Sequence, residues 1–304
     1  MRPLSFLAFG ALAVLGCSSE PRDSTASGGA RATGGSNSSG GSAATGGGSS
    51  TGGAKCEAGP GYQSDAAPQR VNAVSAELVD LDEQPLSLEF VQVCGTDICI
   101  QGQSSESGKV LVSPGENITL PAFKFGEGKT SPRFARLLPN QPNVDFGVVH
   151  SVRLPPFSEG VALLAGKAAG SGGLTLTPAA GSAIKIDKLT FGEAEEQTLR
   201  AVQIPIAQAG DLIDEQLGLE LLYAASPTST QFCPPARLAV ENSEGWEPGT
   251  AVEVLLHGVE IDEEWAPYGG WAKVSDAVVS DDGTQIETTE PGLPLLGVLG
   301  FRRK

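Results

Sequence analysis

The sequence has few of the side chains that carry most catalysis, and few basic residues. Two histidines, one methionine and five cysteines occur in 304 residues, and aromatic residues make up 6% of the chain. Lysine and arginine number 20 against 36 acidic residues, so the formal net charge is −16. This acidity argues against nucleic acid and anionic lipid as partners, because both bind clustered positive charge.

A long hydrophobic run is also missing. The apolar segment near the start extends from Leu4 to Leu15, which is shorter than the about 20 residues that a membrane-spanning helix needs. Arg2 precedes this segment, and the small residue Gly16 follows it. A positive residue, a short apolar segment and a small residue are typical of a secretory signal, so we expect residues 1–16 to be a signal peptide.

The residues at the end of this segment resemble the bacterial lipobox. Val14-Leu15-Gly16-Cys17 fits its pattern, although valine stands where leucine is usual. In that family diacylglycerol is attached to the cysteine thiol, and cleavage leaves this cysteine as the new N-terminus. The resemblance therefore implies lipidation of Cys17 and a membrane partner. Ser18, in place of Asp, implies the outer membrane, on its periplasmic or cell-surface face. An ordinary secretory signal that contains a cysteine is the alternative.

Large apolar side chains are absent from residues 18–55. Gly-Gly recurs there with a six-residue period between Gly28 and Gly52, and Ser, Thr and Ala fill the intervals. No core can form from such residues to offset the entropy of ordering the chain. We therefore expect residues 17–55 to be a lipidated N-terminus followed by a disordered linker rich in Gly, Ser and Thr.

Beyond the linker, short alternating runs rich in β-forming residues are separated by Gly, Pro, Asp and Ser. Examples are VNAVSAELV, LSLEFVQVC and AVEVLLHGVEI. This pattern predicts a mainly β chain with two antiparallel β-sandwich domains. A stretch dotted with prolines at 130–142 separates the predicted domains, which cover 56–130 and 143–304. The segment GDLIDEQLGLELL fits either a short helix or a strand.

Two turns in the first domain carry a family resemblance. The order of strand, DxDxxPL, strand, SxxSGKV and strand resembles the transthyretin-like domain of the carboxypeptidase regulatory family over about residues 70–125. This resemblance implies a structural or adhesive β-sandwich without catalytic residues. Glu83 departs from it, because the family usually has glycine there. The matching positions are Asp80, Asp82, Pro85, Leu86 and Ser107-Gly108-Lys109-Val110.

The second domain is similar to ZU5-type sandwiches in one passage. Residues 220–250 contain an LLxxxSP sequence, then Phe232 and prolines, then a strand and a Pro-Gly-Thr turn, in the order that this family shows. The shared elements are mostly turns. The resemblance implies a second β-sandwich.

With Cys17 lipidated, an even number of cysteines remains. In an exported chain this favours disulfides over free thiols or a metal site, and no CxxC motif occurs. Three pairings of Cys56, Cys94, Cys99 and Cys233 are possible. Cys94 and Cys99 flank Gly-Thr-Asp-Ile at a predicted hairpin, where facing Cα atoms lie within bridging range. Pairing these two leaves Cys56 with Cys233.

The sequence contains none of the common catalytic motifs. HExxH, a P-loop and a nucleophile elbow are missing. Ser182 and Lys185 match SxxK, but they lie in β-like sequence and neither SDN nor KTG follows. His150 and His257 lie in alternating strands, where we expect satisfied imidazoles. We therefore predict no catalytic residues, no enzymatic activity and no cofactor.

Acidic residues near turns offer an alternative, namely calcium binding. None of these groups follows the DxDxDG loop, so we expect an acidic surface and no metal site. Asp282-Gly283 in particular is expected to form a hairpin turn, because glycine supplies the positive φ that such a turn needs. The acidic groups are Asp80 with Asp82, Asp262-Glu263-Glu264, and Asp281-Asp282.

The stretch IDEEWAPYGGWAKV gathers three of the few aromatic residues. We expect Trp265 and Trp271 to flank a loop and pack close together across a hairpin. Alternatively, Trp265, Tyr268 and Trp271 form a stacking surface for a carbohydrate or peptidoglycan. The sequence as a whole predicts a membrane-anchored lipoprotein with a non-catalytic binding, adhesive or structural role, whose further partner is an envelope protein or a glycan.

Overall fold

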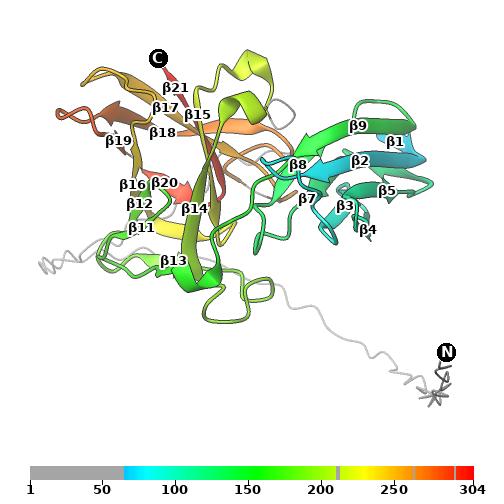
Figure 1. The fold of residues 1–304 in the computed structure, drawn as a ribbon, viewed down its shortest axis with the longest axis horizontal. Helices are drawn as coiled ribbons and strands as arrows, with labels where there is room; N and C mark the ends of the chain where they lie inside the picture. The colour runs from blue at the N-terminus through cyan, green and yellow to red at the C-terminus, as the bar shows by residue number, and fades with distance from the viewer. Residues whose placement is uncertain (1–64, 210–212, 263, 291) are drawn as a thin grey trace, which may run out of the picture. The chain divides into compact units, whose positions relative to one another are not determined.

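The computed structural model describes residues 65–209, 213–262, 264–290 and 292–304 (Figure 1). This part of the chain forms 21 β-strands and three 3-10 turns, and no α-helix occurs in it. The predicted mainly β fold with antiparallel sheets is confirmed. The predicted signal peptide and linker, together with Cys17 and Cys56, lie outside the described residues. No helix within the described ranges has the length and apolar character that spanning a membrane requires.

The first sandwich consists of a three-stranded sheet, a four-stranded sheet and a two-stranded ribbon. The strand orders are β5-β2-β9, β4-β3-β7-β8 and β1-β6. Alternating valines and other apolar residues of these strands fill the core between the sheets. The strands are β1 (Pro68–Val71), β2 (Ala73–Val79), β3 (Phe90–Cys94), β4 (Cys99–Gln103), β5 (Lys109–Val112), β6 (Glu116–Thr119), β7 (Ala122–Phe125), β8 (Phe134–Leu137) and β9 (Asn143–His150).

The first sandwich extends further along the chain than the proline-dotted stretch predicts. A boundary at 143 assigns β9 to the second domain, whereas β9 pairs with β2, from Ala73 opposite Asn143 to Val79 opposite His150. This is the one parallel pair among the described strands. Val144 and Val149 bring β9 into this sheet, because both side chains are buried in the core of the first sandwich.

The second sandwich is a twelve-stranded antiparallel sheet that folds over its own core. Ten strands follow the order β10-β14-β15-β21-β17-β18-β19-β16-β12-β11, and β13 and β20 pair with β16. The N–H of Ala201 in β14 donates to the Ser171 hydroxyl in β11 at 3.0 Å, so strands near the two ends of this order meet and the sheet nearly closes.

The bounds of these strands are β10 (Val161–Ala162), β11 (Ala169–Ser171), β12 (Leu174–Thr177), β13 (Ala183–Lys185), β14 (Thr198–Ile204), β15 (Leu221–Ser226), β16 (Gln231–Glu241), β17 (Ala251–His257), β18 (Trp271–Val279), β19 (Gln285–Thr288), β20 (Leu293–Leu295) and β21 (Val298–Arg303). The 3-10 turns are η1 (Phe157–Glu159), η2 (Ile206–Gln208) and η3 (Glu215–Leu217). The ambiguous segment at 210–222 therefore contains η3 and the start of β15.

Part of the second sheet is buried on both faces. In β15, Leu221 and Tyr223 point into the core of the second sandwich, whereas Leu222 and Ala224 join the core of the first. Leu255 in β17 joins the first core in the same way, as does a valine at the start of β21. The run LLYAAS is thus apolar throughout because both faces are covered, and the two sandwiches share one of their cores.

The turns at residues 80–86 and 105–109 both contain left-handed backbone. Glu83 has φ 58°, which explains why glycine suits this position. The Asp80 carboxylate holds this turn by accepting the N–H groups of Asp82 and Gln84, at 3.0 and 2.9 Å. Gly108 has φ 77°, and a Cβ there would lie 2.4 Å from the Leu78 carbonyl oxygen. Gly108 is therefore required both by its conformation and by the close approach of β2.

The predicted bridge between Cys94 and Cys99 is confirmed. It joins the facing ends of β3 and β4, where the two Cα atoms are 4.0 Å apart. Cys233 is also disulfide-bonded. Its predicted partner, Cys56, lies outside the described residues, so that pairing stays a prediction.

A buried arginine connects the two sandwiches. Arg200 in β14 is 1% exposed, and its Nη1 donates to the carbonyl oxygens of Lys129 and Pro155 at 2.6 and 3.1 Å. Its Nη2 donates to the Ser226 hydroxyl at 3.3 Å, and the guanidinium lies 4.1 Å from the centre of the Phe157 ring. Lys129 belongs to the β7–β8 loop and Pro155 to the segment after β9. Arg200 therefore ties both connecting segments to the second sheet.

Replacing this arginine should destabilise the whole described unit. We expect Arg200→Met to lower the free energy of unfolding by about 2–5 kcal/mol, because two buried carbonyl groups lose their donors. Chemical denaturation monitored by circular dichroism measures the change. Arg237→Met is the matched control: Arg237 is exposed on β16, and its loss should cost less than about 0.5 kcal/mol. Equal stability of the two variants would contradict the assigned role of Arg200.

Candidate functional site

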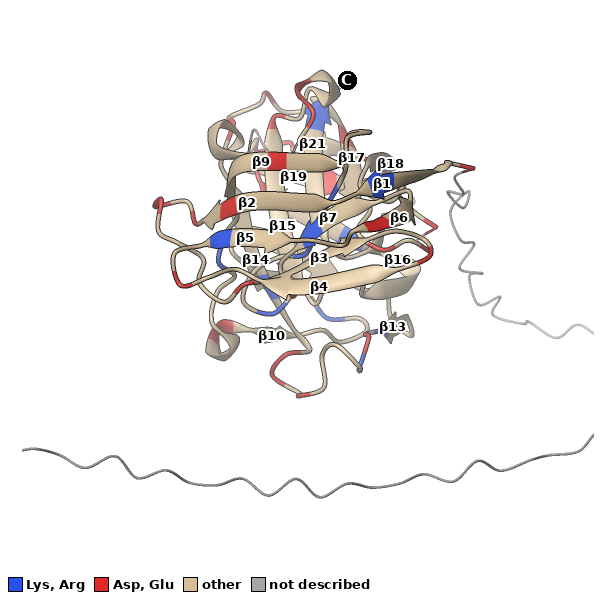
Figure 2. Ribbon diagram, turned by 90° about the vertical axis from the view of Figure 1, so that its right-hand side faces the viewer, with Lys and Arg blue, Asp and Glu red and all other residues tan. Residues whose placement is uncertain are grey.

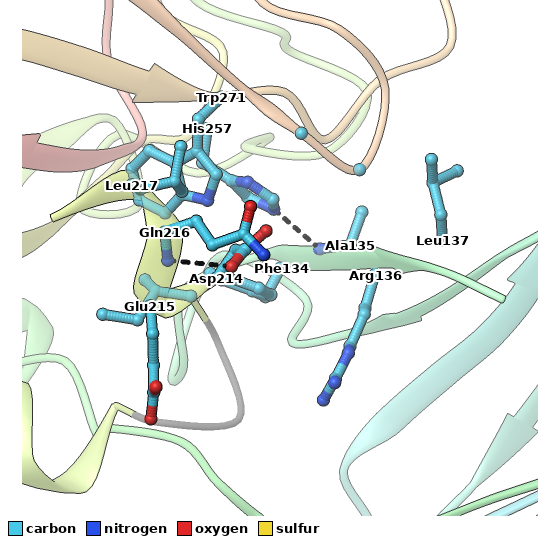
Figure 3. A pocket seen from close by; sticks show the side chains of 13 residues that line it. Phe134, Ala135, Arg136, Leu137, Asp214, Glu215, Gln216, Leu217, His257 and Trp271 are labelled. Atoms are coloured by element: carbon cyan, nitrogen blue, oxygen red, sulfur yellow. Dashed lines mark hydrogen bonds between the residues drawn. The ribbon is translucent and has the colours of Figure 1, made fainter. Parts of the chain in front are cut away.

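A pocket of about 680 Å³ lies where the two sandwiches meet, and we call it the junction pocket (Figure 3). Its volume is within the range of about 300–1,000 Å³ that is typical of small-molecule sites. The first sandwich contributes β8. The second sandwich contributes residues 213–217, the last residue of β17 and residues 269–271. The pocket is therefore built from segments that are far apart in sequence.

Stacked rings form the inner part of this pocket. The His257 and Phe134 rings are nearly parallel, with their centres 4.0 Å apart and an interplanar angle of 16°. Trp271 faces His257 in the register of β17 and β18, and its ring centre is 4.9 Å from that of the imidazole. Phe134 comes from β8, so this stack is also a contact between the two sandwiches.

His257 is held in its neutral form. Burial lowers its pKa to about 3, and the ring also lies against the backbone of Gly270. Nε2 accepts the backbone N–H of Ala135 at 3.2 Å, so the proton of the neutral ring is on Nδ1. Nδ1 makes no regular hydrogen bond with any of the described residues. An imidazole whose Nε2 is already occupied is suited to joining the two sandwiches and poorly suited to accepting a substrate proton.

Polar groups from η3 complete the pocket. Asp214 caps η3, since its carboxylate accepts the backbone N–H of Gln216 at 2.9 Å. This cap fixes the turn from which the Gln216 side chain extends toward His257 in Figure 3. Arg136 reaches the pocket from β8, and its guanidinium lies 5.1 Å from the centre of the Phe146 ring. The pocket thus combines an indole with amide, carboxylate and guanidinium groups.

The three aromatic residues singled out in the sequence do not form one surface. Tyr268 is 5% exposed, and its hydroxyl donates to the Cys94 carbonyl oxygen at 3.2 Å. Trp265 is half-buried against the core of the second sandwich, whereas Trp271 packs against the core shared with the first. The expectation that the two indoles pack together is therefore wrong. Trp271 faces His257, and Trp265 lies in the loop between β17 and β18.

The other predicted positions have structural roles. Asp282-Gly283 forms the predicted turn between β18 and β19, with φ 73° at Gly283. The Asp282 carboxylate accepts hydrogen bonds from the Ser280 hydroxyl and from the backbone N–H and hydroxyl of Thr284, which hold its pKa at about 2. The Ser182 hydroxyl donates to the Pro234 carbonyl oxygen, and Lys185 lies in the short strand β13, so SxxK is not on a helix. His150 lies 2.9 Å from the Glu83 carboxylate.

The acidic residues lie mostly in loops and strand ends in Figure 2. Within the described ranges, no group of three or more His, Cys, Asp or Glu side chains is placed to hold a metal ion. Of the acidic groups considered for calcium, Glu263 lies outside those ranges.

The junction pocket cannot be predicted from local sequence patterns. His257 was visible in the run LLHGV, but only the fold brings it against Ala135, which is 122 residues away in sequence. One local signal exists for η3: Asp214 precedes the turn as a cap, and Gly218 ends it with φ 60°. This signal predicts a turn, but it does not indicate which residues lie opposite the turn in the folded protein.

Comparisons with known proteins gave no match: no family model fits the chain, and neither curated proteins nor solved structures resemble it significantly.

The burial of His257 predicts sensitivity to acid. Its folded-state pKa of about 3 lies below the ordinary value of 6.5, so the unfolded chain takes up this proton first. The resulting stability is present above about pH 6.5. It is lost as the pH falls toward 3, by up to about 1.4 kcal/mol per pH unit. His257→Gln removes the titration, and its free energy of unfolding should change less between pH 6.5 and 4.

Denaturant unfolding at several pH values measures this slope. Gln141→Ala is the control: it changes an exposed, non-titrating residue outside the pocket, so this variant should keep the wild-type slope. A slope for His257→Gln as steep as that of the wild type would show that other groups cause the acid sensitivity.

Proposed function

We propose that this chain is a lipid-anchored protein of the bacterial envelope whose folded part is a non-catalytic binding module. The observation that carries the binding role is the junction pocket, which combines a half-buried indole with hydrogen-bonding side chains. Trp271 is held on strand β18, and Asp214 and Gln216 are held by the capped turn η3. Groups held in this way need little reorganisation when a ligand binds.

The chemistry of the pocket supports a non-catalytic role. None of the residues that line it is a serine, threonine, cysteine or lysine, so it offers no hydroxyl, thiol or amine nucleophile. Its imidazole is neutral and accepts a backbone N–H through Nε2. Asp214 is engaged as the cap of η3. These groups can bind and orient a ligand.

The anchor rests on the lipobox-like residues Val14 to Cys17. Each buried CH₂ of an acyl chain contributes about 0.8 kcal/mol to membrane binding, and several chains on one terminus hold a protein essentially permanently. The repetitive Gly-rich residues that follow would let the folded part reorient above the lipid surface. Ser18 favours the outer membrane in this proposal.

Cys17→Ser tests the anchor. We expect the protein to move from the membrane pellet to the soluble fraction after cell lysis and to lose incorporation of labelled palmitate. Ser18→Ala is the matched control, and it should stay acylated and in the pellet. Membrane retention of Cys17→Ser would refute the anchor, while binding by the folded part would remain open to separate measurement.

A glycan such as peptidoglycan is the second candidate, and the position of Trp271 favours it. Sugar rings stack on aromatic faces, and their hydroxyl groups bond to amides and carboxylates. The junction pocket presents Trp271 together with the Gln216 amide and the Asp214 carboxylate. The site proposed for a glycan is therefore this pocket and not a surface of three aromatic residues, because Tyr268 is buried.

Cosedimentation with purified sacculi tests the glycan proposal. Gln216→Ala and Trp271→Phe should each reduce the bound fraction at least about threefold, since each removes a contact worth about 1 kcal/mol. Gln141→Ala changes an exposed glutamine outside the pocket and should bind as the wild type does. Unchanged binding by both pocket variants would exclude this site for glycans.

A further inference from the structure

One edge of strand β8 borders the junction pocket. In the sheet order β4-β3-β7-β8 this strand comes last, so one of its edges has no neighbouring strand of that sheet. The whole strand, from Phe134 to Leu137, lines the pocket, and Figure 3 shows it across the pocket from η3. Edge strands offer backbone N–H and C=O groups with which another chain can pair.

The alternation of backbone groups along β8 decides which of them lie on this edge. The Ala135 N–H donates to His257 Nε2 at 3.2 Å, so it points away from β7. The Leu138 N–H donates to the Pro121 carbonyl oxygen at 2.9 Å, on the side of β7. Backbone groups of successive residues in a strand point to opposite edges. The N–H and the carbonyl oxygen of Leu137 therefore both point away from β7.

Leu137 keeps both of these groups open to a ligand. Neither forms a hydrogen bond with a described residue outside the β7–β8 pair, and the residue is 39% exposed. A Cβ at residue 269 would lie 3.1 Å from the Leu137 nitrogen, so Gly269 leaves room beside it. His257 occupies the N–H of Ala135, and Pro139 has no N–H. The open part of the edge is therefore short and centred on Leu137.

We infer that the junction pocket binds an extended peptide, one residue of which pairs with Leu137. This inference rests on the proposed binding role of the pocket and names its class of ligand. Facing residues of antiparallel strands exchange two N–H···O bonds, so one amino-acid residue satisfies both groups of Leu137. The N–H and C=O of a single acetamido group point in opposite directions, because the amide is planar and trans. An acetylated sugar would therefore satisfy only one of the two groups.

The side chains that line the pocket indicate which peptide fits it. Asp214 and Glu215 contribute two carboxylates, Arg136 contributes one guanidinium, and the imidazole is neutral, so the lining is net negative. This charge favours a basic ligand. The indole of Trp271 adds apolar surface, and the face of an indole attracts a cation. A peptide that contains lysine is thus the best match.

A blocked lysine tests the pairing with Leu137. Nα-acetyl-lysine N-methylamide contains one residue with both backbone groups, and it is titrated into the ¹⁵N-labelled full-length chain. We expect the Leu137 amide signal to move and its hydrogen exchange to slow, because the N–H gains an acceptor. The amide of Asp281, in the exposed β18–β19 turn, is the internal reference and should not respond.

Leu137→Pro removes the N–H without removing a bond to β7, because this N–H faces away from that strand. Affinity for the blocked lysine should fall about fivefold or more, since one backbone hydrogen bond is lost. Leu137→Ala is the matched control: it keeps the N–H, so its affinity should stay within about twofold of the wild type.

A change in the ligand covers the case in which Leu137→Pro does not fold. An ester oxygen in place of the lysine N–H removes the donor to the Leu137 carbonyl oxygen, and it should weaken binding to the wild-type protein by a similar factor.

Three results would overturn the inference. In the first, the blocked lysine leaves the Leu137 amide signal unmoved at millimolar concentration. In the second, folded Leu137→Pro, or the ester, binds as tightly as its parent. In the third, N-acetylglucosamine moves the Leu137 signal and the blocked lysine does not, which assigns the pocket to sugars. Sacculus binding that depends on Gln216 and Trp271 would still support the binding role of the pocket in each case.

Discussion

Burial of the second sheet on both faces is the constraint on which the described structure depends. The sheet covers its own core with one face and completes the core of the first sandwich with the other. Burial of apolar surface contributes about 25 cal/mol per Å², so the shared core stabilises both sandwiches at once. The proline-dotted stretch at 130–142 lies between β7 and β9 inside the first sandwich and therefore does not separate the two sandwiches.

Two buried polar side chains bond to backbone groups at this contact. Arg200 satisfies two carbonyl oxygens of the connecting segments, and His257 accepts a backbone N–H from β8. Both side chains come from the second sheet and meet backbone groups of the first half. The junction pocket lies beside the hydrogen bond between His257 and Ala135, and its other polar side chains face solvent. The same contact that fixes the relative position of the sandwiches thus supplies the candidate site.

Local sequence patterns predicted the features that depend on neighbouring residues. The alternating runs predicted strands, the spacing of Cys94 and Cys99 predicted a bridge across a hairpin, and Asp282-Gly283 predicted a turn. Features that depend on distant residues were not predicted. The run LLYAAS shows no alternation of apolar and polar residues because a core covers each of its faces. Strand β9 follows the proline-rich stretch that predicted a domain boundary, yet it pairs with β2 of the first sandwich. Pairing of β9 with β2 and contact of His257 with Ala135 arise from packing alone.

Glu260 is synthesised after the two basic residues that it pairs with. It serves two cations of the first sandwich, and it follows Arg133 by 127 residues. At about 5–20 residues per second, a ribosome adds that length in roughly 6–25 s. During this interval Lys124 and Arg133 repel each other without their shared counter-ion. The first sandwich therefore has this counter-ion only after residue 260 has been added to the chain.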